Sequence, residues 1–332
     1  MILKRRNFLK YIAGFTTASS PLFSIFSLFV KKAAGRKIQK SIGKVVIVKR
    51  PEVFTSPGNV SPEVTYQMLS DGICRLTGHK TPASAWSSLF SPSEKIGIKV
   101  NALGGRKICT HTELTYAVVK HLTECGIPAQ NIIIWDRLTR ELEKAGYGIQ
   151  RGGRSVRCFG TDDDYGFLPE SSGSIGSCFS RILTRKCDAI ISIPVLKDHD
   201  LAGVSLNLKN FYGAIHNPNK YHDNGCDPFI ADLNCHPHIK NKLRLVIIDG
   251  LMGLYNGGPA FKPQWAWPYS GLLLSQDPVA VDLIGTEIIE KKRRSKGLPS
   301  LKQDGRFPVH IQTAAKKGLG TGDLKKIEKI VI

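Results

Sequence analysis

The sequence predicts an α/β protein with a mostly parallel sheet, helices on both faces, and an N-terminal export signal outside the fold. Short apolar runs of strand length alternate with segments of helical apolar spacing from residue 95 onward. This alternation favours parallel pairing, because the chain crosses over through a helix before it returns to the sheet. The 332 residues suffice for a sizeable core, and no internal repeat interrupts the pattern.

Cap and turn residues help to place the elements. Ser61 followed by Pro62 is typical of a helix start, as is Asp277 followed by Pro278, and Gly297 is typical of a helix end. The predicted strands are 44–48, 95–100, 131–135, 155–159, 189–195 and 244–248, with a further apolar run at 271–274. The predicted helices are 61–77, 113–125, 141–145, one within 227–239, and 278–293.

The positive charge is concentrated at the start of the chain. The formal net charge is +20, but residues 1–50 contain twelve Lys or Arg and no acid, which leaves +8 for residues 51–332. A mildly basic remainder fits anionic small ligands or a membrane surface better than a nucleic-acid-binding face. We therefore expect no nucleic-acid partner.

The N-terminus predicts export. Lys4-Arg5-Arg6-Asn7-Phe8-Leu9-Lys10 precedes the uncharged residues 11–30 and resembles a twin-arginine export signal. The alternative is a simple N-terminal anchor, and residues 11–30 would also serve as an anchor if the signal were retained. We expect the twin-arginine machinery as a partner, a periplasmic or otherwise exported location, and contact with the membrane only through this segment.

Three parts follow from these observations. Residues 1–35 are predicted to be the signal or anchor, and residues 36–93 a basic connector with an N-terminal extension. Residues 94–332 are predicted to form the α/β domain.

Polar side chains follow several of the predicted strands. In open α/β sheets, ligands bind beyond the carboxyl ends of the strands, so these side chains are expected to share one edge. For each residue taken singly, a helix cap or turn is the alternative. The residues at strand ends are Lys99, Asn101, Asp136, Lys197, Asp198, His199, Asp249 and Asp277.

The segment 194–216 is unusually polar for a stretch beside a buried strand. It follows the apolar run 189–193 and adds Lys209 and Asn210 to the strand-end residues. Lysine supplies a point charge suited to phosphate or carboxylate, and asparagine can orient such a ligand. We expect an anion-binding site here, with His111 near it as a base or ligand.

Metal ligands are concentrated in residues 216–238. This segment contains six His or Cys residues, of which His222 and Cys226 are the preferred metal candidates. The alternative is that the cysteines are buried or disulfide-linked and the histidines lie on the surface. None of the eight cysteines forms a C-x-x-C pair, so a standard iron–sulfur cluster is not expected.

Five ordered blocks resemble the bacterial and archaeal family called domain of unknown function 362. They are residues 95–101, 110–115, 194–199, 205–213 and 275–282. The chain looks most similar to exported members without an iron–sulfur insert. Other members carry a ferredoxin-like domain, which implies redox chemistry for those. The resemblance implies a fold and a site and carries no agreed reaction.

These observations favour an exported enzyme that binds an anionic small molecule, with a metal or redox cofactor as an open question. Oxidoreductase is the favoured class, on the grounds of the export route and the ferredoxin-bearing relatives. The alternative is a non-catalytic metal- or ligand-binding or maturation protein. The expected catalytic residues are Lys197, Asp198 and His199. The expected ligand-binding residues are Lys99, Asn101, His111, Asp136, Lys209, Asn210, Asp249 and Asp277.

Overall fold

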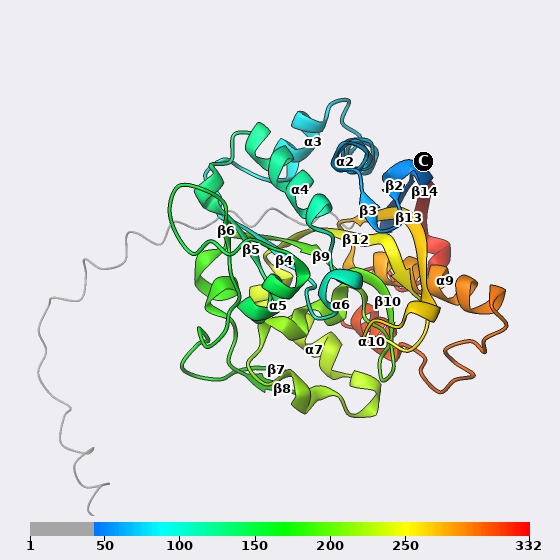
Figure 1. Ribbon diagram of the computed structural model, residues 1–332. Coiled ribbons are helices and arrows are strands. Elements are labelled where there is room, and N and C mark those ends of the chain that lie inside the picture. Colours follow the sequence, from blue (N-terminus) through cyan, green and yellow to red (C-terminus); the bar gives the residue numbers. More distant parts are fainter. Residues whose placement is uncertain (1–42) are drawn as a thin grey trace, which may run out of the picture. The chain divides into compact units, whose positions relative to one another are not determined.

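A ten-stranded sheet forms the centre of the computed structural model, which describes residues 43–332 (Figure 1). In spatial order its main path runs through β14 (Ile327–Val331), β1 (Gly43–Lys49), β13 (Ala266–Ser275), β12 (Leu243–Leu254), β9 (Ala189–Ile193), β4 (Ile96–Val100), β5 (Ile132–Trp135) and β6 (Arg157–Cys158). Strand β10 (Val195–His199) joins beside β12 and pairs with β11 (Gly203–Val204). Two small hairpins, β2 (Phe54–Ser56) with β3 (Asn59–Val60) and β7 (Glu170–Ser172) with β8 (Ile175–Ser177), lie outside this sheet.

Most neighbouring strands are parallel, as the sequence predicts. Strands β6, β5, β4, β9 and β12 run in one direction, and β10 runs parallel to β12. Strand β13 is antiparallel to both β12 and β1. The carboxyl ends of the parallel strands therefore share one edge, whereas β13 ends at the other.

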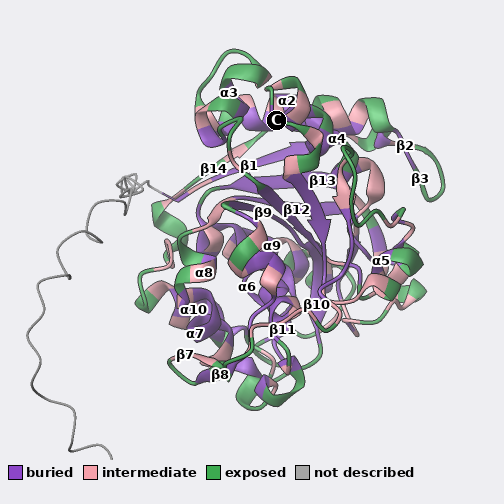
Figure 2. Cartoon of the chain, turned by 90° about the vertical axis from the view of Figure 1, so that its left-hand side faces the viewer, coloured by how far each residue is buried: buried purple, intermediate pink, exposed green. Residues whose placement is uncertain are grey.

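Helices cover both faces of the sheet, with buried strands between them (Figure 2). One face carries α2 (Pro62–Thr77), α3 (Pro82–Leu89), α4 (Thr112–Glu124) and α5 (Thr139–Ala145). The other carries α6 (Leu206–Asn210), α7 (Phe229–Cys235), α8 (Pro237–Lys240), α9 (Pro278–Ser295) and α10 (Val309–Lys316). Alternation along β1 explains the two cores, since Val46 and Val48 face the first group and Val45 and Ile47 the second.

The boundary expected at residue 94 does not divide this structure. Strand β1 pairs with both β13 and β14, and α2 packs on β1, so residues 43–93 belong to the same compact unit as the rest. The predicted signal or anchor and most of the basic connector lie outside the described residues. Within residues 43–332, no helix is long and apolar enough to cross a membrane.

Proline divides the strand predicted at 189–195. Pro194 separates β9 from β10, and its carbonyl accepts a hydrogen bond from the Asp249 backbone N–H at 2.8 Å. Proline has no N–H to donate to a sheet ladder, so the chain changes neighbour at this point. As a result, β10 leaves the position beside β4 and carries its polar side chains past the end of β9.

Candidate functional site

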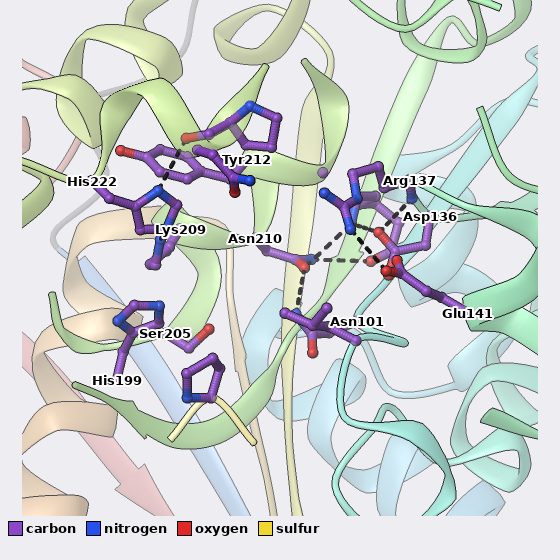
Figure 3. A pocket seen from close by; sticks show the side chains of 16 residues that line it. Asn101, Asp136, Arg137, Glu141, His199, Ser205, Lys209, Asn210, Tyr212 and His222 are labelled. Carbon is purple, nitrogen blue, oxygen red and sulfur yellow. Dashed lines mark hydrogen bonds and ion pairs between the residues drawn. The ribbon is translucent and has the colours of Figure 1, made fainter. Parts of the chain in front are cut away.

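A pocket lies at the carboxyl edge of the parallel strands (Figure 3). Strand β4 and its following loop contribute Lys99 and Asn101, and Asp136 and Arg137 follow β5. Strand β10 contributes His199 at its last position. The segment of α6 and the loops after it contribute Lys209, Asn210, Tyr212 and His222. The cavity has a volume of about 260 Å³.

One wall of this pocket is held by an internal ion pair. Lys99 Nζ donates to Asp136 Oδ1 at 2.6 Å and to the Val100 carbonyl at 2.8 Å. The Asp136 carboxylate also accepts the backbone N–H groups of Ala102 and Arg137, both at 2.7 Å. Both partners are buried, so the positive and negative charges balance each other inside the protein.

Asn210 connects this ion pair to Asn101. Its Oδ1 lies 3.4 Å from Lys99 Nζ and 3.3 Å from Asn101 Nδ2, and its own Nδ2 donates to Ser192 Oγ at 3.1 Å. We call Lys99, Asn101, Asp136 and Asn210 the paired wall. These side chains bond to one another and form a rigid surface.

Gly213 lies against this ion pair and was not among the predicted site residues. A Cβ atom at this position would lie 2.8 Å from Asp136 Oδ1 and 3.0 Å from Lys99 Nζ. Such contacts are shorter than van der Waals packing allows, so glycine lets the backbone after α6 approach the ion pair.

Lys209 has a different environment. Its Nζ lies 3.1 Å from His222 Nε2 and 4.0 Å from the centre of the Tyr212 ring. No carboxylate pairs with it in the described part of the chain. The residue is only 6 % exposed, and burial lowers the pKa of Lys209 to about 8, against the opposing effect of Cys226.

The hydrogen bonds of His222 define its tautomer. Its Nδ1 lies 3.1 Å from the Pro218 carbonyl, which can only accept, so Nδ1 carries the proton. Nε2 of the neutral ring is then an acceptor and faces Lys209 Nζ. Burial and the charge of Lys209 lower the pKa of His222, which keeps the ring neutral.

His199 has the opposite tautomer. Its Nδ1 accepts the backbone N–H groups of Leu201 at 3.1 Å and Ala202 at 3.3 Å, so the proton of the neutral ring is on Nε2. Burial first, and then Lys209, lower the pKa of His199 to about 2. His199 is therefore a neutral ring with Nε2–H as its hydrogen-bond donor. We call Lys209, His199, His222 and Tyr212 the unpaired wall, which Figure 3 shows across the pocket from Asp136.

The donor set of the unpaired wall does not fit a metal ion. His222 Nε2 faces the Lys209 amine, Cys226 lies beside the same amine, and a bound cation would be repelled by it. His199 Nε2 carries a proton and offers no lone pair. Within residues 43–332, a group of three close metal-ligand side chains occurs at Glu170, His236 and His238, outside the pocket.

Two predicted catalytic residues lie behind the pocket surface. Lys197 is fully buried, donates to Asn101 Oδ1 at 2.8 Å, and has its pKa lowered to about 8 by burial. Asp198 pairs with Arg306 at 3.0 Å and accepts the Gly258 backbone N–H at 2.8 Å. Lys197 therefore supports Asn101, and Asp198 anchors neighbouring loops.

Three predicted ligand-binding residues do not line the pocket. Asp249 lies within β12 and binds both the backbone N–H and Nδ1 of His111, at 2.7 and 2.8 Å. Burial opposes protonation of His111, but Asp249 outweighs it and raises the pKa of His111. Asp277 caps α9 through Val279 and Ala280 at the opposite edge of the sheet, because β13 is antiparallel to its neighbours.

Glu141 is a pocket residue that was not among the predicted ligand-binding residues. It pairs with Arg137 at 2.8 Å, a contact that their four-residue spacing could have indicated. Asp282 lies outside the pocket and accepts the backbone N–H groups of Asn207 at 2.9 Å and Leu208 at 2.8 Å. This carboxylate caps α6 and so positions Lys209.

Three comparisons with known proteins complete the description. The family model described as "Domain of unknown function (DUF362)" matches residues 96–287. A comparison with curated proteins gives no significant match. A crystal structure of a protein from Thermotoga maritima is similar with 13 % sequence identity and a TM-score of 0.45. The match covers 72 % of this chain and 61 % of that one, so the chain spans less than two thirds of its length.

Proposed function

This chain belongs to the family of domain of unknown function 362, which is defined without a reaction. From the pocket, we propose that the protein binds a small anionic molecule between the paired and unpaired walls. Lys209 supplies the positive charge, and His199 donates a hydrogen bond. An enzyme that acts on the bound anion is the form of this proposal that we favour.

The absence of a carboxylate partner for Lys209 within residues 43–332 is the observation that supports this proposal most directly. Three cations line the pocket, and two of them are neutralised, Lys99 by Asp136 and Arg137 by Glu141. Lys209 is nearly as buried as the paired Lys99, yet its neighbours are a histidine nitrogen, an aromatic ring and the Cys226 thiol. A buried ammonium without a counter-charge is unfavourable, so an anion would stabilise it.

The neutral donors beside Lys209 also suit an anion. His199 presents Nε2–H, and no hydrogen bond of this nitrogen to another group occurs among residues 43–332. Charge-assisted hydrogen bonds to carboxylate or phosphate oxygens are stronger than neutral ones. A cavity of about 260 Å³ is of a size suited to a small molecule.

Location and reaction class depend on other grounds. Export by the twin-arginine route rests on the sequence of residues 4–10. An oxidoreductase role rests on the ferredoxin-bearing relatives that the family resemblance brings in. The pocket itself favours anion binding and proton transfer, because Lys209 and His222 are in contact and both have lowered pKa values.

Calorimetry with two simple anions tests the proposal. Malonate and inorganic phosphate represent the carboxylate and phosphate sources, and at least one is expected to bind the wild-type protein. Lys209→Met is expected to weaken that binding by about 10- to 100-fold, because it removes a charge-assisted hydrogen bond of about 1.5–3 kcal/mol.

Lys220→Met is the matched control, since Lys220 is an exposed lysine in the same segment. It should bind the anion as the wild type does. Equal affinity of Lys209→Met and wild type would contradict the proposal, and so would a loss of the same size in Lys220→Met.

A further inference from the structure

Lys209 differs from Lys99 in its charge partner and from Lys197 in its access to the cavity. Lys99 is held by Asp136, and Lys197 is fully enclosed behind Asn101. Lys209 lines the cavity and has no carboxylate partner within residues 43–332. A lysine with these properties can lose its proton near neutral pH and then act as a nucleophile.

Burial favours the neutral form of Lys209, and the neighbouring Cys226 opposes this effect without cancelling it. The groups that face it are His222, His199, Tyr212, Cys226 and, by its electrostatic effect, His310, and none of these is a carboxylate. Burial lowers the pKa of Lys209 to about 8, compared with about 10.5 for a free lysine. At pH 7, this shift increases the neutral amine by a factor on the order of 100 relative to an exposed lysine.

His222 is placed to move a proton to and from this amine. Its Nδ1–H is held by the Pro218 carbonyl, which leaves the Nε2 lone pair 3.1 Å from Lys209 Nζ. A nucleophile in contact with a base that a third group orients is the usual arrangement in covalent catalysis. In this pocket the three members are Lys209, His222 and the carbonyl of Pro218.

From this geometry we propose that Lys209 forms an imine with a small anionic aldehyde or 2-oxo acid bound in the pocket. The inference rests on the proposed anion site and names its substrate class. The carboxylate of such a molecule would accept a hydrogen bond from His199 Nε2–H, and its carbonyl carbon would meet the Lys209 amine, which loses its ammonium proton before it attacks.

The reaction needs no further reagent. The lone pair of the neutral Lys209 nitrogen attacks the carbonyl carbon, and the π electrons of the C=O bond move to oxygen, which takes up a proton. The nitrogen releases two protons during the reaction, one to the former carbonyl oxygen and one to Nε2 of His222, which passes it to the departing hydroxyl group, and the carbon–oxygen bond breaks with loss of water. One amine and one carbonyl compound thus give one imine and one water.

Reductive trapping tests this proposal. The full chain is incubated with glyoxylate, an aldehyde that carries a carboxylate, together with cyanoborohydride, and the modified peptides are identified by mass spectrometry. Lys209 is expected to be modified once per chain and about 100-fold faster than the exposed Lys220. A rate at Lys209 no higher than that at Lys220 would overturn the proposal.

Two variants separate the nucleophile from its surroundings. Lys209→Arg keeps the positive charge and cannot form an imine, so it should lose the adduct and retain anion binding. His222→Gln should slow trapping at Lys209 by about 100-fold, the usual contribution of a general base, while trapping at Lys220 is unchanged. Unchanged trapping in His222→Gln would exclude His222 from the reaction.

The trapping and calorimetry results can fail independently. If malonate or phosphate binds through Lys209 but glyoxylate gives no selective adduct, the anion site remains and the imine chemistry is wrong. If the adduct forms selectively while Lys209→Met binds anions as the wild type does, Lys209 is a nucleophile and the proposed anion site is wrong.

Discussion

The two walls of the pocket contain similar side chains and balance their charges in opposite ways. In the paired wall, Lys99 meets Asp136 at 2.6 Å, and each remaining polar atom of the pair is bonded to backbone or amide groups. In the unpaired wall, Lys209 meets a neutral histidine and an aromatic ring. Under the proposed function, the paired wall maintains the shape of the site and the unpaired wall meets the ligand.

Breaking the ion pair of the paired wall should have the largest effect. Asp136→Asn leaves the Lys99 ammonium buried without a counter-charge, which is expected to lower the free energy of unfolding by about 3–5 kcal/mol. Urea denaturation at pH 7 measures this change. Lys209→Met is the comparison from the unpaired wall, where the free energy of unfolding should stay the same or rise, because no pair is broken.

A loss of less than about 1 kcal/mol in Asp136→Asn would show that the pair is not structural. If Lys209→Met lowered the free energy of unfolding by several kcal/mol, the distinction between the two walls would also be contradicted. The two variants together therefore test the comparison without knowledge of the ligand.

The sequence was sufficient to predict most of the elements that form the sheet and its helices. Helices α2 and α9 begin where Ser61 and Asp277 cap them, and both caps are local features of the chain. Helix α10 and strand β14 were not predicted. Strand β14 is an edge strand with exposed residues, and its pairing with β1 joins the two ends of the described chain, which no local pattern reveals.

The positions of site residues could be predicted wherever the direction of the preceding strand could be predicted. Lys99, Asn101, Asp136 and His199 meet because β4, β5 and β10 run the same way. The apolar run at 271–274 gave no indication that β13 runs the other way, so Asp277 was expected at the wrong edge. The tautomers of the histidines depend on nearby backbone groups that only the folded chain brings into place.

The pH dependence of anion affinity tests whether the charge of the unpaired wall binds the ligand. We expect an effect of intermediate size. The pKa of Lys209 is about 8, so the ammonium that binds the anion is present below pH 8 and is lost as the pH rises above it. The affinity for malonate, whose carboxyl groups stay ionised in this range, is expected to be constant near pH 7 and to fall toward tenfold per unit above pH 8. Calorimetry between about pH 6.5 and 9.5 measures this fall.

Lys209→Met is the control for this profile. It keeps Lys197, whose pKa is also about 8, and His199, whose pKa of about 2 leaves it neutral throughout. Its weaker binding should therefore be independent of pH. An equal fall in wild type and variant would assign the titration to Lys197 and not to the unpaired wall.

The smallest expected effect comes from removing the carboxylate that pairs with Arg137, another cation of the pocket. Glu141→Gln removes the partner of Arg137, which lies 2.8 Å away in a partly exposed pair. The free energy of unfolding should fall by less than about 1 kcal/mol, as for other exposed pairs. Among the residues that the structure describes, Arg137 then has no carboxylate partner, as is already true of Lys209, so the affinity for malonate should rise by about 2- to 5-fold in calorimetry.

A matched pair at the other edge of the sheet shows whether this gain belongs to the pocket. Glu94 and Arg244 also lie 2.8 Å apart with similar exposure, and neither lines the pocket. Glu94→Gln should lower stability by a similar amount and leave the affinity unchanged. A gain in both variants would indicate a general effect of net charge. A gain in Glu141→Gln alone, which should diminish as salt screens the charges, would mean that removing a carboxylate partner turns a structural cation into a ligand-binding one.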